Sequence, residues 1–228
     1  MDDDTLHRDK TRQFAVACYR GRKRFDGTYL THAVAVASLA EQFGVRLFRQ
    51  HGMLMPLDRV TVDCMWHAGL LHSVIDLCGP TWDDVLSVTN LTVADFVAAL
   101  SRDNRLPRPR RTFSYVSQLL QADIPVQAIS LADCCYELTD AVALLRRDPN
   151  KAKSAFALWS EEAADWVRAI EHATRHRFPE EWSWCNDVAS RLLSVFKYWR
   201  RRQQLLQDIQ ACPGTVSLIK PVRGVSSP

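Results

Sequence analysis

The sequence lacks the features of a membrane or secreted protein. No apolar run approaches about 20 residues, the length that a membrane-spanning helix needs. The N-terminus, MDDDTLHRDK, is acidic and polar, unlike a signal peptide. The seven cysteines are irregularly spaced and include no CxxC pair, which argues against a zinc ribbon. We therefore expect reduced, mostly buried thiols and a cytoplasmic protein.

The chain also lacks a large excess of positive or negative charge. The formal net charge is only +3 over 228 residues. This balance does not by itself indicate binding to nucleic acid or to a membrane surface, and we expect neither partner. The basic stretch KYWRRR (197–202) is explained equally well by a charged last turn of a helix. With 47% hydrophobic residues, the chain has ample material for one folded core.

Strand-type alternation, internal repeats and low-complexity tracts are missing, whereas apolar residues recur at helical spacing along most of the chain. The sequence therefore predicts an all-α protein. In the N-terminal half, we expect a first helix that ends near Gly21, a second with Thr31 as its N-cap and Gly44 as its stop, a third from about Val60 to Leu77, and two short helices over 82–88 and 93–100. In the C-terminal half, we expect a long helix from near Pro125 to Leu145 and further helices over 151–176, over 179–196 and in the arginine-rich stretch after that. A basic loop is expected over 103–111.

Three polar residues fall on helix faces that should be buried. His32 begins an apolar face, His72 lies on an apolar stripe, and Asp133 opens an acidic row with Glu137 and Asp140. Burying a carboxylate costs free energy unless it is paired or bound to a metal. Two histidines and an aspartate from three helices could converge on one cation, such as Mn²⁺, Zn²⁺ or Fe²⁺. The alternatives are ordinary core histidines and a solvated acidic face.

Four blocks of sequence resemble, in order, the (p)ppGpp hydrolase domain of the RelA/SpoT family and its small stand-alone relatives. They are ACYRGRKRFDGTYLTHAVAVA (17–37), AGLLHSVID (68–76), TWDDV (81–85) and ISLADCCYEL (129–138). That family consists of HD-fold metallohydrolases that remove pyrophosphate from the 3′ position of (p)ppGpp, usually with Mn²⁺. The resemblance implies an HD-type helical bundle. We expect a single domain over 1–205, with its core at 14–145 and C-terminal helices at 151–205, and a loosely ordered tail over 206–228.

The resemblance also implies roles for individual residues. His32, His72 and Asp133 match metal ligands of the family. Arg24 matches the arginine that packs on the guanine base, since a planar guanidinium can stack on a purine and still reach phosphate oxygens. Tyr29 matches the aromatic residue just before the first ligand histidine. The expected ligand is therefore a guanine nucleotide such as (p)ppGpp.

The chain departs from the family pattern at positions that matter for catalysis. Ser73 stands where the family has a ligand aspartate, and Leu77 replaces the aspartate of the Glu-Asp pair that handles the attacking water. Asp76 keeps a carboxylate on a shorter arm and is the expected water-activating residue. Phe25 replaces a lysine in the nucleotide-binding loop, and Glu137 replaces an asparagine. Glu137 lies one turn after the predicted ligand and could swing toward the metal.

These departures leave the function open between three classes. Losing a general acid or base typically costs about 10²–10⁴ in rate, and losing ligand-shell groups weakens metal binding about 10–100-fold or more. Mn²⁺ or another divalent metal is therefore expected to be weakly held or absent. The chain is then a hydrolase with a rearranged site, a catalytically inactive nucleotide-binding module, or a scaffold for a protein partner. Five tryptophans near the C-terminus either contact such a partner or pack in a core: Trp159, Trp166, Trp182, Trp184 and Trp199.

Overall fold

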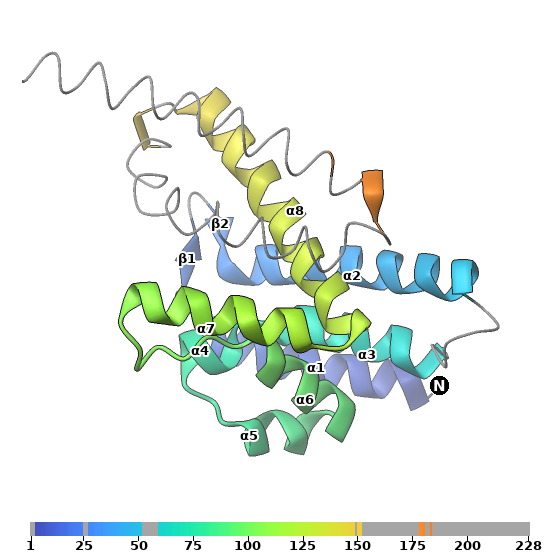
Figure 1. Cartoon of the computed structure of the whole chain (residues 1–228). Helices are drawn as coiled ribbons and strands as arrows, with labels where there is room; N and C mark the ends of the chain where they lie inside the picture. Colours follow the sequence, from blue (N-terminus) through green and yellow to red (C-terminus); the bar gives the residue numbers. More distant parts are fainter. Residues whose placement is uncertain are drawn as a thin grey trace, which may run out of the picture.

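The computed structural model describes residues 3–24, 27–51, 59–148, 150–151, 178–180 and 183. In these ranges the chain is a bundle of helices with one short hairpin (Figure 1), which confirms the predicted all-α class. The hairpin was not expected from the sequence. The elements are α1 Asp3–Cys18, β1 Lys23–Arg24, β2 Gly27–Thr28, α2 Tyr29–His51, α3 Arg59–Leu71, α4 Val74–Cys78, α5 Trp82–Val88, α6 Leu91–Leu100, α7 Arg108–Gln121 and α8 Ile124–Arg147.

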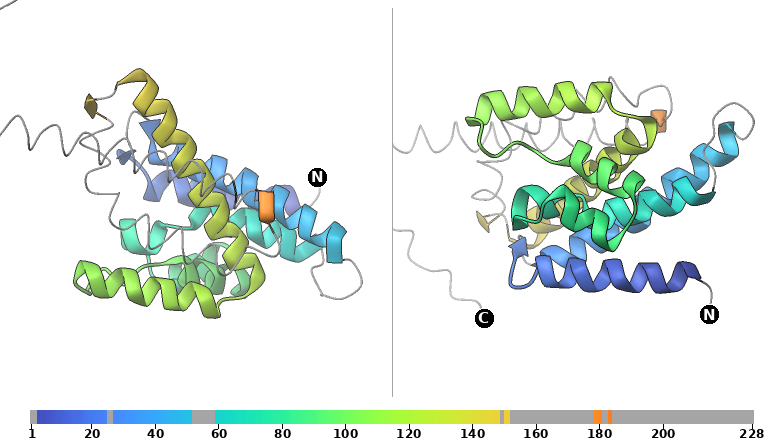
Figure 2. Two further views of the ribbon diagram at one scale, coloured as in Figure 1. Left: turned by 45° about the horizontal axis from the view of Figure 1, so that its top comes forward. Right: turned by 90° about the horizontal axis from the view of Figure 1, so that it is seen from below.

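The bundle is layered around α2, α3 and α8. Seen from below, α1 and α7 lie on opposite sides of the molecule, with the shorter helices between them (Figure 2). The long α8 crosses the bundle and packs on α2, and α3 packs on both α2 and α6. One hydrophobic cluster runs through all of these contacts, and its members include fully buried Leu47, Leu70, Leu71, Ile129 and Leu131. None of the helices in the described ranges combines the length and apolar character needed to span a bilayer.

Two glycines let α2 and α3 approach closely. A Cβ built on Gly69 would lie 2.9 Å from the Cα of Ala37, and one built on Gly44 would lie 2.8 Å from the Sδ of Met65. The expectation that Gly44 ends the second helix is wrong, because α2 continues to His51. This glycine makes room for the neighbouring helix instead of stopping its own.

The third predicted helix is interrupted at the point where the candidate metal ligand lies. Its apolar spacing suggested one helix to Leu77, but α3 ends at Leu71 and α4 begins at Val74. Ser73, at the N-cap of α4, has φ −122° and ψ 15°, outside the helical range. Periodicity missed the break because the apolar stripe continues across it. The predicted end at Gly79 is confirmed, since this residue is the C-cap with φ +95°.

The remaining helices match the sequence pattern except for α7. Helix α5 begins with a capping box between Thr81 and Asp84, and Asn90 caps α6. The expected loop over 103–111 is shorter than predicted, because α7 starts at Arg108. Pro109 occupies its first turn, where a missing N–H group leaves no hydrogen bond unmade. Helix α8 begins near Pro125, as expected.

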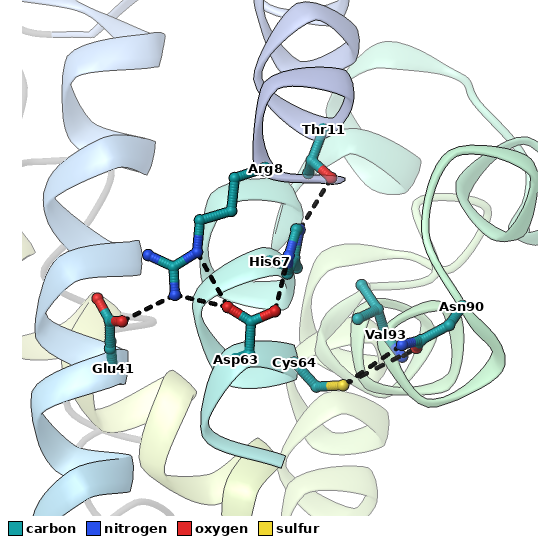
Figure 3. Close-up of polar contacts among 8 residues, drawn as sticks. All are labelled: Arg8, Thr11, Glu41, Asp63, Cys64, His67, Asn90 and Val93. Atoms are coloured by element: carbon teal, nitrogen blue, oxygen red, sulfur yellow. Dashed lines mark hydrogen bonds and ion pairs between the residues drawn. The ribbon is translucent and has the colours of Figure 1, made fainter. Parts of the chain in front are cut away.

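A polar network ties α1 to α2 and α3 (Figure 3). The guanidinium of Arg8 donates to Asp63 at 2.5 and 2.9 Å and to Glu41 at 2.8 Å. His67 Nδ1 lies 2.8 Å from the hydroxyl of Thr11, and its Nε2 lies 3.3 Å from Asp63. These bonds hold α1 against the core.

The described residues do not reach most of the C-terminal predictions. The helices expected over 151–205, the five tryptophans and the tail over 206–228 lie outside them, apart from 151, 178–180 and 183. Phe178 is fully buried, with its ring 5.0 Å from that of Phe43. Within the described ranges no cysteine is in a disulfide, and three of the five there are buried, as the expectation of mostly buried cysteines requires.

Candidate functional site

The two histidines and the aspartate predicted as metal ligands come together in the structure. His32 lies on α2, His72 follows α3, and Asp133 lies on α8. His32 Nε2 lies 3.1 Å from Asp133 Oδ1 and 3.3 Å from His72 Nε2, and His72 Nε2 lies 3.8 Å from Asp133 Oδ1. The three ligand atoms all lie within 4.8 Å of one another. Three side chains from distant parts of the sequence thus form a candidate metal site.

The main chain prepares His72 to act as a ligand. Its Nδ1 lies 2.7 Å from the carbonyl oxygen of Gly69, so Nδ1–H donates and the lone pair of Nε2 faces the cluster. Burial lowers the pKa of His72 to about 4, which keeps the imidazole neutral at neutral pH. A neutral imidazole held by its second nitrogen is the usual form of a metal-bound histidine.

Asp133 supplies negative charge to the cluster. Burial acts to raise the pKa of its carboxyl group, but His72, His32 and Arg24 outweigh burial and bring the pKa below its usual range. Asp133 Oδ1 is buried, with the Nε2 atoms of His32 and His72 at 3.1 and 3.8 Å, and His32 Nδ1 is buried without a hydrogen-bond partner among the described residues. A buried carboxylate oxygen with so little polar contact is costly, and a cation at the cluster would bind it. The donor set therefore fits a divalent metal ion.

The hairpin brings Arg24 to the edge of this cluster. Its guanidinium forms an ion pair with Glu137, lies 3.3 Å from His32 Nε2 through Nη1, and stands 5.8 Å from the ring centroid of Tyr29. Both members of the ion pair are nearly buried, with 14% and 11% of their side chains exposed. Glu137 thus binds Arg24 in this structure and does not turn toward the cluster. Phe25, the other predicted nucleotide contact of this loop, lies outside the described residues.

Two cavities of about 200 Å³ each adjoin Arg24, which lines both of them, whereas Glu137 lines one. The first, here called the inner cavity, is lined by His72 and Asp133. Its other lining residues are Tyr29, Ser73, Asp76, Leu77, Leu100, Arg102, Tyr115, Ile129 and Glu137. The second, the outer cavity, is lined by His32, Gly27, Thr28, Thr31, Tyr136, Asp140, Ala143, Leu144 and Arg147. The candidate metal ligands are therefore divided between the walls of the two cavities, with His72 and Asp133 at the inner one and His32 at the outer one.

Asp76 lines the inner cavity, and the pKa of its carboxyl group differs from the usual value. Burial raises its pKa to about 6, although the guanidinium and backbone amide of Arg102 lower it. Its Oδ1 is buried and accepts no hydrogen bond in the described part of the chain. A carboxyl group that titrates near neutral pH beside a candidate metal site can accept a proton from water.

Ser73 and Leu77 also line the inner cavity, so the two departures from the family pattern fall at the site itself. Ser73 is half-buried, and 37% of Leu77 is exposed. Both side chains are neutral, and neither can ligate a metal ion strongly or take a proton from water. The site therefore has fewer carboxylates than its sequence resemblance implies.

Sequence reasoning missed two residues of the inner cavity, Arg102 and Tyr115. Arg102 immediately precedes the predicted basic loop and matches none of the four blocks of resemblance. Tyr115 lies on α7, the helix that the sequence pattern did not reveal, and burial raises its pKa to about 12. The only sequence signal for a role of Arg102 was its position two residues after Leu100, the buried last residue of an apolar helix.

Comparisons with known proteins agree with the fold and with the resemblance. No family model matches the chain. A curated relative, guanosine-3′,5′-bis(diphosphate) 3′-pyrophosphohydrolase MESH1 of Danio rerio, is 26% identical over 134 residues, which cover 58% of this chain and 67% of that protein. A solved structure of a metazoan ortholog of SpoT, described as hydrolysing ppGpp and acting in starvation responses, matches with a TM-score of 0.58 at 16% identity, covering 85% of this chain and 98% of the other. The chain is therefore an HD-type helical protein that resembles the (p)ppGpp hydrolases.

Proposed function

We propose that this protein is a metal-dependent phosphohydrolase of a guanosine (pyro)phosphate nucleotide, with Mn²⁺ or a similar cation held weakly by His32, His72 and Asp133. The observation that carries the proposal is the convergence of these three ligand atoms, within 4.8 Å, beside a cavity that also contains Asp76. The similarity to a pyrophosphohydrolase supports the substrate class. Three protein ligands leave coordination positions open, as catalytic metal sites require.

In this proposal each residue has one task. A divalent cation at the cluster would lower the pKa of water and polarise a phosphoryl oxygen. His32, His72 and Asp133 orient that cation, and the carboxylate of Asp76 accepts a proton from the attacking water. Arg24 stacks on the guanine base once its guanidinium has left Glu137. Chemistry is expected to be slow, because Ser73 and Leu77 contribute neither a ligand nor a second carboxylate.

A second candidate function is nucleotide binding without turnover. The neutral side chains of Ser73 and Leu77 at the cavity wall favour it, since they leave the pocket in place and remove two catalytic carboxylates. Nucleotide binding requires the cavity and Arg24, whereas hydrolysis also requires the metal and Asp76. Experiments on the metal site and on Asp76 can therefore distinguish hydrolysis from nucleotide binding without turnover.

The first test is to measure bound metal and pyrophosphate release on one preparation, with added Mn²⁺ and (p)ppGpp, beside the variant His72→Ala. We expect wild-type release, and a fall of at least about 100-fold in Mn²⁺ affinity and in rate in the variant. Circular dichroism checks that the variant is folded. Release that persists in folded His72→Ala would refute the metal site, and nucleotide binding without release would favour the second candidate.

The pH dependence tests the role of Asp76. Because the carboxylate form is the base, and its pKa lies at about 6, the rate should rise between about pH 5 and 7 and then level off. Below about pH 6 it should fall roughly tenfold per pH unit. The variant Asp76→Asn should be about 10²–10⁴-fold slower and should lose this dependence. A wild-type profile that is flat over the same range would assign the base to another group.

The location of the protein and the extent of its domain are part of the proposal. A cytoplasmic location is supported by the five described cysteines, none of which is in a disulfide. We propose a single domain over 1–205; the continuous core of the described helices supports its part at 14–145.

A further inference from the structure

Arg102 lies on the wall of the inner cavity, on the segment that follows α6. Its guanidinium carbon stands 4.9 Å from the centroid of the Tyr115 ring, so an aromatic side chain supports the planar group. Arg102 is half-buried at this wall, which also contains His72 and Asp133. Its side chain therefore borders the space beside the candidate metal ligands.

Charged side chains of both signs line the inner cavity. Arg24 forms an ion pair with Glu137, and Asp133 lies beside His32 and His72. Arg102 is close enough to Asp76 to lower the pKa of that carboxyl group, against the larger effect of burial. A phosphate group that enters the cavity therefore meets a guanidinium beside the proposed base.

The dimensions of the inner cavity suit a small anion. A volume of about 200 Å³ corresponds to the space of roughly six or seven water molecules in the liquid. Such a space has room for a phosphate-sized group at one end. The five N–H donors of a guanidinium match phosphate oxygens in a two-point arrangement, which a lysine cannot reproduce.

We propose that Arg102 is a phosphate-binding residue of the inner cavity, and that it holds the pyrophosphoryl group of the ligand between Asp76 and the candidate metal ligands. This inference rests on the proposed function for the identity of the ligand. In this arrangement Tyr115 keeps the guanidinium plane in position, and the cation supplied by Arg102 compensates the repulsion between an anionic ligand and the carboxylates of the same cavity.

The test compares Arg102→Gln and Arg102→Lys with a matched control, Arg105→Gln. Arg105 comes from the same segment and carries the same charge, but 90% of its side chain is exposed and it pairs with Asp103 outside the cavity. The affinities for inorganic pyrophosphate, for (p)ppGpp and for Mn²⁺ alone are measured by calorimetry on the full chain. We expect pyrophosphate affinity to fall at least about tenfold in Arg102→Gln and less in Arg102→Lys. Mn²⁺ affinity and the control variant should change less than about twofold.

The outcomes separate this inference from the proposed function. Equal pyrophosphate affinity in Arg102→Gln and Arg105→Gln, with (p)ppGpp still hydrolysed, would overturn the role of Arg102 and leave the function intact. Wild-type binding of pyrophosphate that depends on Arg102, without binding of (p)ppGpp, would overturn the nucleotide assignment and support the anion site. If Arg102→Gln does not fold, Arg102→Lys decides, because it keeps the charge and loses the two-point contact. Wild-type protein that binds no pyrophosphate would overturn the inference.

Discussion

The double variant Ser73→Asp with Leu77→Asp is expected to release pyrophosphate from (p)ppGpp about 10²–10⁴ times faster than the wild type. Both positions line the inner cavity, Ser73 beside His72 and Leu77 one helical turn further along α4. The aspartate at 73 would add an anionic ligand to the cluster, which should raise metal affinity at least about tenfold. The aspartate at 77 would stand next to Asp76 and share the handling of the attacking water. The measurements are kcat/KM with Mn²⁺ and the Mn²⁺ dissociation constant.

Single variants and exposed controls make this experiment decisive. Ser73→Asp alone should mainly tighten metal binding, and Leu77→Asp alone should mainly raise the rate at saturating metal. The matched controls are Ser38→Asp and Leu91→Asp, two exposed positions on α2 and α6 that line neither cavity. They should leave both quantities unchanged. A double variant that binds Mn²⁺ more tightly without a faster release would contradict the hydrolase proposal and favour nucleotide binding without turnover.

The second large effect is expected at a residue that lines neither the inner nor the outer cavity. Gly69→Val should lower the free energy of unfolding by about 3 kcal/mol, because even its Cβ would lie 2.9 Å from the Cα of Ala37. Main-chain atoms cannot rotate away as a flexible side chain can, so α2 and α3 must separate. For a chain of this size the loss corresponds to a fall of roughly 6–12 °C in the unfolding temperature. Thermal unfolding followed by circular dichroism measures it.

A glycine in open space provides the control. At Gly27 a Cβ would meet nothing nearer than the carbonyl oxygen of Arg24 at 4.0 Å, so Gly27→Ala should leave the unfolding temperature within about 2 °C. Gly69→Val should also weaken Mn²⁺ binding, because the carbonyl of Gly69 holds His72 in its ligand orientation. An unchanged unfolding temperature in Gly69→Val would show that the two helices can separate at little cost.

Much of the site could be predicted because its residues carry local signals. His32, His72 and Asp133 stood out as polar groups on helix faces expected to be buried, and the motif match identified Arg24. The structure places all four together at the two cavities. The helices that follow clear caps, such as α5 after Thr81, were also predictable, because a capping motif involves only three or four adjacent residues.

The parts that sequence reasoning missed depend on contacts between distant segments. Gly44 signals a helix end when it is considered alone, and only the neighbouring Met65 shows that it serves packing. The break at Ser73 leaves the apolar stripe intact, so periodicity cannot reveal it. The role of Arg102 depends on α7, whose polar first turn and prolines resemble a loop. For Gly44 and Arg102 the neighbours that show the role, Met65 and Tyr115, are more than ten residues away in the sequence.

The ion pair between Arg24 and Glu137 also has a consequence for the speed of ligand binding. Because Arg24 lines both cavities and is held by Glu137, a ligand long enough to occupy both is expected to separate the pair first. Association then has two steps, an opening and an entry, and its rate constant should fall below that of a preformed open pocket. With so little of either side chain in water, added salt will do little to hasten the opening. The same barrier slows the departure of a ligand after the pair has closed around it, which favours a long residence time in the pocket.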